Sequence, residues 1–326
     1  MINKFLKLTI TLFFTFAINF SANAEIKVVA SIKPIHSLAS YLMDGVGKPD
    51  LIVDGYNSPH GFALKPSHAK MLQNADLVFW VGEDLETFLE KPLKSVAKKA
   101  EKIELMEIKG LKKLEFRERN IFEAHDDHKE HGHKEDKHDD HKEHGHKEDK
   151  HDDHHGHAHG EHDPHIWLDP INAKVILSEM AEHLIENDQE NASKYKANLK
   201  KAHKELDKLT KKVKSDLNKD FRSIVFHDAY QYFEKRFDVN VLGAFTVNTD
   251  VLPGAEQLSE IREVIEHEKV SCVFSEPQFN PDIIKAVAKD TNIKTGVIDP
   301  LGATLNPGKT LYFDLIRNMS KSFKGC

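Results

Sequence analysis

The sequence lacks any apolar run long enough to cross a membrane. Its longest one, residues 8–20, falls short of the about 20 residues that a spanning helix needs, and it lies at the start of the chain. Two lysines precede this run and Ala-Asn-Ala at 22–24 follows it, an arrangement typical of a secretory signal peptide. We therefore expect cleavage after Ala24 and a mature chain that is not inserted in a membrane.

Cysteine is nearly absent as well. No cysteine lies at the cleavage site, which argues against a lipid anchor, and only Cys272 and Cys326 occur at all. A disulfide between them would close a loop of about 55 residues and stabilise the fold by about 4 kcal/mol in the chain-entropy model. The alternative is two unrelated thiols, one in a buried strand and one on a loose tail. We favour the disulfide because the signal peptide indicates an oxidising compartment, for which a bacterial periplasm fits better than an extracellular fate.

The chain also lacks an excess of positive charge, since its formal net charge is −7. Residues 125–162 hold thirteen acidic side chains and six lysines, so most of the negative charge lies in this one segment. The rest of the mature chain is nearly balanced. This excludes a basic face for nucleic acid or for an anionic membrane surface.

The same segment has almost no aliphatic side chains, the methyl group of Ala158 excepted. It consists of the unit HDDHKEHGHKEDK, repeated twice without change and then a third time in degraded form. Such a composition cannot offset the entropy of ordering, so we expect a disordered loop that collects metal ions weakly through imidazole nitrogens. Its histidines are His125, His128, His131, His133, His138, His141, His144, His146, His151, His154, His155, His157, His159 and His162.

Short apolar runs alternate with helical patterns on both sides of this tract, which predicts an α/β fold with two parallel-sheet lobes. We expect an N-terminal lobe over 25–120, the histidine-rich loop over 121–164, the end of the first lobe and a linker helix over 165–220, and a C-terminal lobe over 221–326. The strands are expected at 26–32, 51–54, 77–81, 102–108, 222–226, 239–245, 270–274 and 294–298. The helices are expected at 34–44, 66–74, 85–99, 230–237, 255–268, 281–290 and 308–323.

The linker is predicted to be one long helical stretch, from Ile171 to about Leu217. Apolar residues recur within it at spacings of three and four, from Tyr195 to Leu217, and form a continuous stripe. These 23 residues would span roughly 33 Å, about the diameter of one small lobe. A rigid rod of this kind between two lobes would limit hinge motion.

Three histidines outside the tract follow strands or lie in loops, where open α/β sheets bind ligands. His60 follows the expected strand at 51–54, His165 follows the tract, and His227 follows Ile-Val-Phe. Asp299 follows Gly-Val-Ile in the same way. A lone histidine after a strand is more often structural than not, but three imidazoles with one further position form a plausible zinc shell. Manganese would more often have two carboxylates.

Several short motifs are spread along nearly the whole mature chain. They are Pro59-His60, Leu64–Ser67, Gln73–Val78, Trp80–Gly82, His165–Pro170, Val225–Phe233, Phe245–Asn248, Pro253–Ala255, Cys272–Phe279 and Asp299–Gly302. Taken together, they make the chain resemble the periplasmic solute-binding proteins of bacterial zinc ABC transporters, the ZnuA type. The resemblance implies two lobes with a backbone helix and zinc held between them by His60, His165 and His227. It also implies a histidine-rich loop over the site and a disulfide matching Cys272–Cys326.

One position departs from this pattern. Some relatives have a carboxylate directly before the first ligand histidine, where this chain has Pro59. We therefore expect the fourth zinc ligand to be water or a tract histidine, slightly ahead of Asp299. Glu276 is either a carboxylate that orients one imidazole or a merely structural acid.

The expected function is zinc capture in the periplasm and delivery to an ABC permease and its ATPase, by a monomer that binds no nucleic acid. The alternatives are a carrier of manganese or another divalent metal, a secreted zinc buffer without a transport partner, and a zinc hydrolase. We expect no enzymatic activity, because no H-E-x-x-H or comparable general-base motif is present.

Overall fold

The computed structural model describes residues 25–117, 119–122, 161–217, 220–247, 249 and 251–326. The expected signal peptide and the tract histidines from His125 to His159 lie outside the described residues. His162 is described, and it forms an isolated antiparallel bridge with Glu115. Within the described part of the chain, no helix combines the length and the apolar character needed to cross a bilayer.

The first lobe is built on a four-stranded parallel sheet with the order β2-β1-β3-β4. β1 is buried along its whole length, as expected for a parallel strand that is covered on both faces. Its strands are β1 (Val28–Ile32), β2 (Asp50–Val53), β3 (Leu77–Trp80) and β4 (Glu101–Glu104), and the 3-10 turn η1 (Leu105–Glu107) follows β4. Its helices are α1 (Lys33–Leu42), α2 (Pro66–Asn74) and α3 (Thr87–Ser95).

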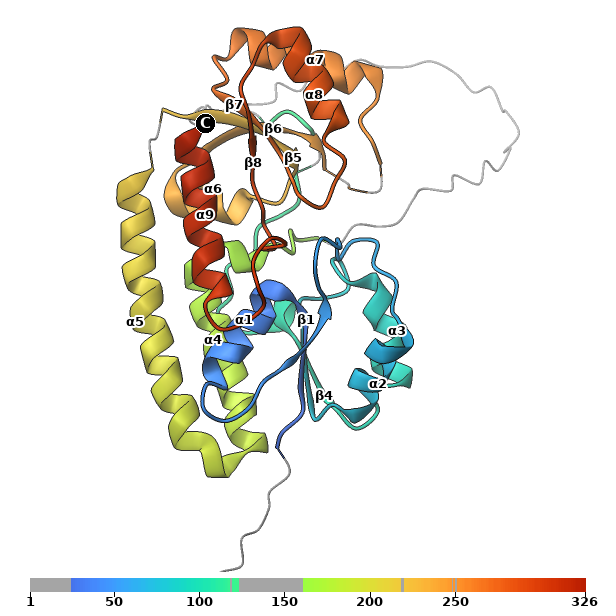
Figure 1. Cartoon of the computed structure of the whole chain (residues 1–326), viewed down its shortest axis with the longest axis vertical. Coiled ribbons are helices and arrows are strands. Elements are labelled where there is room, and N and C mark those ends of the chain that lie inside the picture. Colours follow the sequence, from blue (N-terminus) through green and yellow to red (C-terminus); the bar gives the residue numbers. More distant parts are fainter. Residues whose placement is uncertain (1–24, 118, 123–160, 218–219, 248, 250) are drawn as a thin grey trace, which may run out of the picture.

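The second lobe repeats this plan with the strand order β6-β5-β7-β8, again all parallel. Figure 1 shows it as the upper lobe, with α7 and α8 over its outer face. Its strands are β5 (Arg222–His227), β6 (Asn240–Thr246), β7 (Cys272–Ser275) and β8 (Thr295–Val297). Its helices are α6 (Gln231–Phe237), α7 (Ala255–His267) and α8 (Asp282–Thr291). The expected pair of parallel-sheet lobes is therefore confirmed.

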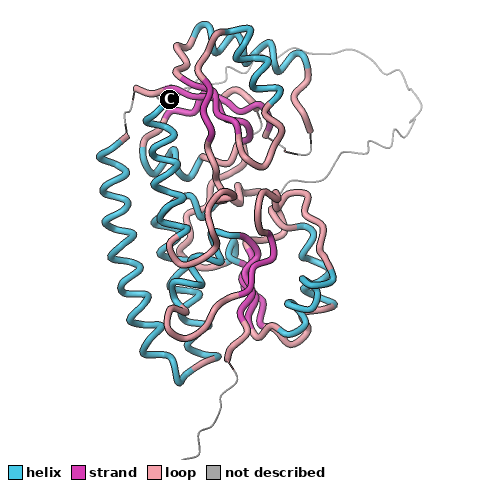
Figure 2. Tube along the Cα trace, viewed as in Figure 1, coloured by secondary structure: helices cyan, strands magenta, loops and turns pink. Residues whose placement is uncertain are grey.

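The linker differs from the single helical stretch that the sequence suggested. It consists of η2 (Ile166–Leu168), α4 (Pro170–Asn187) and α5 (Ala192–Asp216), and the 3-10 turn η3 (Gln189–Asn191) separates the two helices. At the break, the Asp188 carboxylate accepts hydrogen bonds from the Asn191 side chain and from the Tyr195 hydroxyl. These side-chain bonds compete with the helical ladder and end α4. Figure 2 shows α4 and α5 side by side.

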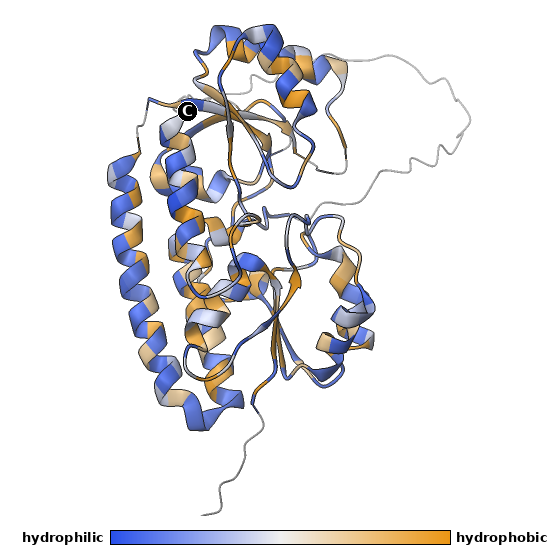
Figure 3. Cartoon of the chain, in the orientation of Figure 1, coloured by the Kyte–Doolittle hydropathy of each residue, from blue (hydrophilic) through white to orange (hydrophobic). Residues whose placement is uncertain are grey.

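α5 is the long rod that the apolar stripe predicts. Tyr195, Ala202, Leu206, Leu209 and Val213 are buried along one face. At 1.5 Å per residue, its 25 residues span about 37 Å. Figure 3 shows that the remainder of α5 is mostly hydrophilic, as expected for a helix that packs on the protein with one side only.

α9 (Leu311–Gly325) connects the two lobes at the end of the chain. Its body packs against α1 and α5 in Figure 1, while Phe323 near its end is buried against Phe274 of β7. Cys326 then forms the expected disulfide with Cys272 of β7, with the two Cα atoms 5.7 Å apart. Hydrophobic packing and a covalent bond therefore fix α9 to both lobes.

Candidate metal centre

His60 lies in the loop between β2 and α2. This loop begins at Asp54, whose carboxylate accepts a hydrogen bond from the backbone N–H of Gly55 at 2.7 Å. Gly55 has φ +71°, a left-handed conformation that glycine adopts without strain. Further along, the backbone N–H of His60 donates to the Ser58 hydroxyl at 3.2 Å. These local bonds shape the loop, and they present a half-buried imidazole at the carboxyl end of the sheet.

His165 is held by the residues directly before it. The buried Asp163 carboxylate accepts from the backbone N–H of His165 at 3.0 Å and lies 2.7 Å from its Nδ1. The Tyr232 hydroxyl donates to the Asp163 carbonyl at 2.8 Å, which ties this turn to the second lobe. With Nδ1–H donated to Asp163, Nε2 of His165 keeps its lone pair.

His227 is the last residue of β5, and its Nδ1 lies 2.7 Å from Glu276 Oε1. Glu276 directly follows β7, which pairs with β5 in parallel, so both side chains lie at the same edge of the sheet. The imidazole is 6% exposed and the carboxylate 0% exposed, so water does not compete for this contact. Glu276 therefore orients an imidazole, one of the two roles considered for it from the sequence.

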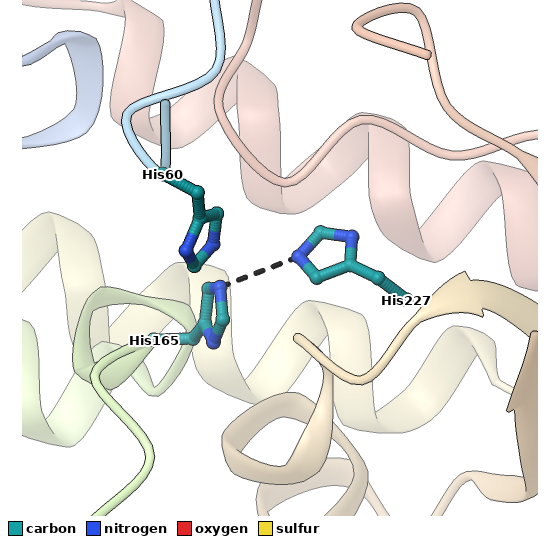
Figure 4. A group of neighbouring side chains, drawn as sticks. All are labelled: His60, His165 and His227. Carbon is teal, nitrogen blue, oxygen red and sulfur yellow. Dashed lines mark hydrogen bonds between the residues drawn. The ribbon is translucent and has the colours of Figure 1, made fainter. Parts of the chain in front are cut away.

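The three imidazoles point toward one another, as Figure 4 shows. One ligand atom from each of His60, His165 and His227 lies within 4.8 Å of the other two. Nε2 of His165 and Nε2 of His227 are 3.4 Å apart. Two nitrogens at about 2.0–2.1 Å from one tetrahedral zinc would be about 3.3 Å apart. The two Nε2 atoms therefore have the separation expected for two ligands of one zinc ion.

Burial and neighbouring charges act in opposite directions on the two buried imidazoles. Desolvation, together with the nearby His227, holds the pKa of His165 well below its usual value. Desolvation also disfavours a proton on His227, but the charge and hydrogen bond of Glu276 outweigh it and raise the pKa. Burial raises the pKa of Asp163 to about 7. Burial therefore dominates at His165, whereas the Glu276 carboxylate dominates at His227.

The space between the imidazoles is small and mostly apolar. The cavity measures about 10 Å³, close to the smallest volume that holds one water molecule. Its walls include Trp167, Phe279, Pro300 and Leu301, and Trp167 donates its indole N–H to the Pro300 carbonyl at 2.8 Å. A pocket of this size suits a single ion.

Asp299, the fourth candidate ligand from the sequence, is not part of this group. Its Oδ1 accepts hydrogen bonds from the backbone N–H groups of Leu301 and Gly302 at 3.2 and 2.9 Å, and from the Gln278 side chain at 3.0 Å. In this structure, Asp299 organises the loop that forms one wall of the pocket.

A second group of metal-ligand type consists of Glu101, His183 and Glu186, at the other end of the first lobe. His183 lies 2.7 Å from Glu101, and the Glu101 side chain is 41% exposed. These groups pair with each other at an open surface. The group of three histidines in the cleft, two of them buried, is therefore the stronger candidate.

Comparisons with known proteins identify the family of the chain. A family model described as "Zinc-uptake complex component A periplasmic" matches residues 28–326. The "High-affinity zinc uptake system protein ZnuA" of Brucella abortus is 48% identical over 307 residues, which cover 92% of this chain and 91% of that protein. The protein of the same name from Yersinia pestis is 36% identical over 305 residues, covering 93% of this chain and 92% of that protein.

Solved structures show the same fold. A crystal structure of ZnuA aligns with a TM-score of 0.70 at 20% identity, and it covers 92% of this chain and 100% of that chain. A Mn-bound periplasmic metal-binding protein from candidatus Liberibacter asiaticus aligns with a TM-score of 0.68 at 18% identity, covering 92% of this chain and 98% of that chain. The family model and the curated relatives decide the assignment: the chain belongs to the ZnuA family of periplasmic zinc-uptake components.

Proposed function

We propose that the protein binds one zinc ion tightly between its lobes and delivers it to the permease of a zinc ABC transporter. His60, His165 and His227 would be the protein ligands. The observation that carries this proposal is the convergence of three imidazoles from three separate segments of the chain on one small cavity. Membership of a zinc-uptake family supports zinc as the cargo.

The two buried histidines, His165 and His227, would act as a prepared pair, meaning that their metal-binding nitrogens are oriented before the ion binds. Asp163 and Glu276 each accept from Nδ1, which directs both Nε2 atoms toward the cavity before any ion arrives. His60 comes from a more exposed loop and would complete the shell from the other side. A prepared pair reduces the ordering cost of binding.

We propose water or a tract histidine as the fourth ligand. Oδ1 of Asp299 already accepts from two backbone N–H groups, which favours its role in the loop over a place among the ligands. An all-nitrogen protein shell also favours zinc over manganese, which prefers oxygen ligands. This argues against the manganese carrier as the alternative function.

The histidine-rich tract would act as a collector for this site. It places fourteen histidines within the 38 residues 125–162, directly before the cleft histidine His165 in the sequence. Its last histidine, His162, is held beside Glu115 only three residues before His165. Ions held by the tract would then face the site at effective concentrations in the millimolar range.

We propose that cleavage after Ala24 releases the chain into the periplasm as a monomer. Its functional units would be the lobes over 25–120 and 221–326, the tract over 121–164 and the linker over 165–220. The permease and its ATPase would receive the ion, and no chemical step would occur on the protein. The alternative of a zinc buffer without a transport partner predicts that no permease co-purifies.

Competitive zinc titration of the mature protein tests the proposal. His60→Ala and His227→Ala should each weaken the tight site by more than about 100-fold, beyond the effect of losing an outer-shell partner. His267→Ala is the matched control, since His267 is an exposed histidine at the end of α7. Unchanged affinity in either cleft variant would remove that residue from the shell.

A second titration separates the site from the tract. Deletion of residues 125–162 should remove weaker zinc equivalents and leave one tight site. Loss of the tight site on deletion would show that the tract, and not the cleft, holds the ion. Tighter binding of manganese than of zinc would favour the alternative cargo.

A further inference from the structure

Lys33 is a buried lysine at an unusual position, the first residue of α1. The positive end of the helix dipole lies there, so a cation is disfavoured relative to a carboxylate. Burial adds a desolvation cost, since the side chain is 5% exposed. Both costs require strong compensating contacts, and the structure provides them.

The Lys33 ammonium donates to three carbonyl oxygens of a single loop. The acceptors are Ala303 at 2.9 Å, Leu305 at 3.0 Å and Gly302 at 3.3 Å. This loop connects β8 of the second lobe to α9, which packs on the first lobe. Lys33 therefore fixes a segment that crosses between the lobes.

The same ammonium also reaches the loop that carries His60. Asp54 Oδ1 lies 3.4 Å from Lys33 Nζ, and Asp54 is the residue at which this loop leaves β2. Two loops that border the metal pocket are thus joined through one side chain. One of them presents His60, and the other contributes Pro300 and Leu301 to the pocket wall.

We propose that Lys33 is a positioning residue for zinc binding. It holds the His60 loop and the 299–305 loop in register, so that the His60 imidazole meets the prepared pair of His165 and His227. Lys33 does not touch the ion. This inference rests on the proposed function, because it concerns how the three-histidine site is assembled.

A double-mutant cycle tests the proposal, with zinc affinity as the readout. Lys33→Met keeps the length of the stem and removes the charge and the donors. It should weaken zinc binding about tenfold in the otherwise unchanged protein, as expected when a residue that supports a metal ligand without touching the metal is lost. In a His60→Ala background the same change should have no further effect, since Lys33 acts through His60. Lys33→Arg, which keeps a cation, should recover part of the affinity.

Lys194→Met is the matched control. Lys194 also donates to a carbonyl oxygen, that of Gly45 at 2.7 Å, but on the outer surface. It should leave zinc affinity unchanged in both backgrounds. A merely structural role for Lys33 predicts a different result: lower thermal stability of the metal-free protein, with equal losses of affinity whether or not His60 is present. That result would overturn the proposal.

Asp54→Asn provides a second test that does not depend on the folding of the Lys33 variant. The Asp54 side chain is 60% exposed, so its substitution leaves the core intact. It should weaken zinc binding about threefold, as expected for a partly exposed ion pair, and only when His60 is present. Unchanged affinity, or an equal loss in both backgrounds, would contradict the inference.

The two proposals fail in distinguishable ways. If His60→Ala alone leaves zinc affinity unchanged, the three-histidine site is wrong. If His60→Ala weakens binding but Lys33→Met and Asp54→Asn do not, the site stands and only the positioning role of Lys33 is lost.

Discussion

Replacement of Glu276 by glutamine should weaken zinc binding about tenfold at pH 7.5 without unfolding the protein. Glutamine has nearly the same shape, and its carbonyl oxygen can still accept from Nδ1 of His227. Only the charge is removed. Hydrogen bonds to charged groups contribute about 1.5–3 kcal/mol and neutral ones about 0.5–1.5 kcal/mol, so the expected loss is about 1.4 kcal/mol. This corresponds to about a factor of ten in the dissociation constant.

The 2.7 Å contact and its burial justify the full magnitude, because solvent does not screen this pair. The pH dependence should also change. In the wild type, Glu276 raises the pKa of His227, so a proton competes with zinc as the pH falls. In the variant, the pKa of His227 is no longer raised by the Glu276 charge, so the proton competes less with zinc. The difference in affinity between wild type and variant should therefore shrink between pH 7.5 and pH 6.

Competition with a chromophoric chelator at both pH values provides the assay. Glu260→Gln is the control, because Glu260 is an exposed carboxylate on α7. Equal affinities of wild type and Glu276→Gln at pH 7.5 would refute the role assigned to the Glu276 carboxylate. A constant ratio across the pH range would refute the link through the His227 proton.

Three further predictions concern pH and stability. Zinc affinity of the wild type should fall as the pH drops from 7.5 to 5.5, because zinc must displace the proton that Glu276 favours on His227, and equal affinities at both values would contradict histidine coordination. Burial raises the pKa of Glu86 to about 7, above its unfolded value near 4.5, so the ionised carboxylate destabilises the fold increasingly as the pH rises from about 4.5 to 7. Glu86→Gln should therefore stabilise the protein more at pH 8 than at pH 5 in chemical denaturation, and an equal effect at both values would be inconsistent with this reasoning. Replacing Cys272 and Cys326 together by serine should lower the free energy of unfolding by about 4 kcal/mol relative to oxidised wild type, and an unchanged denaturation midpoint would show that the cross-link is not stabilising. Reduced wild type is the control and should unfold like the variant.

Much of the fold could be predicted because its signals are local. Apolar runs identified the central strands of both sheets, such as β1 and β3, and the helix at Pro66–Asn74 begins at the proline that the sequence indicated. The strand expected at 102–108 is shorter, because β4 ends at Glu104 and a 3-10 turn follows it. His60 and His227 were identifiable because His60 lies in the loop after β2 and His227 ends β5, and ligand sites lie at strand ends. In each case a short window of sequence contains the whole argument.

The supporting contacts were harder to predict, for different reasons. Asp163 was missed although its signal is local, since a carboxylate two residues before a ligand histidine can accept from both its backbone and its ring. Lys33 could not be found in this way, because its carbonyl partners lie about 270 residues away in the chain. The break at Asp188 was hidden by the apolar periodicity on either side of it.

Asp163 and Glu276 also influence how strongly the cleft attracts a cation. Both side chains are 0% exposed, so each unneutralised charge would carry a large desolvation penalty. A divalent cation among the imidazoles would offset part of the negative charge of these buried acids. The acids behind the ligands would therefore strengthen binding of the ion without touching it, in addition to the bonds made by the nitrogens.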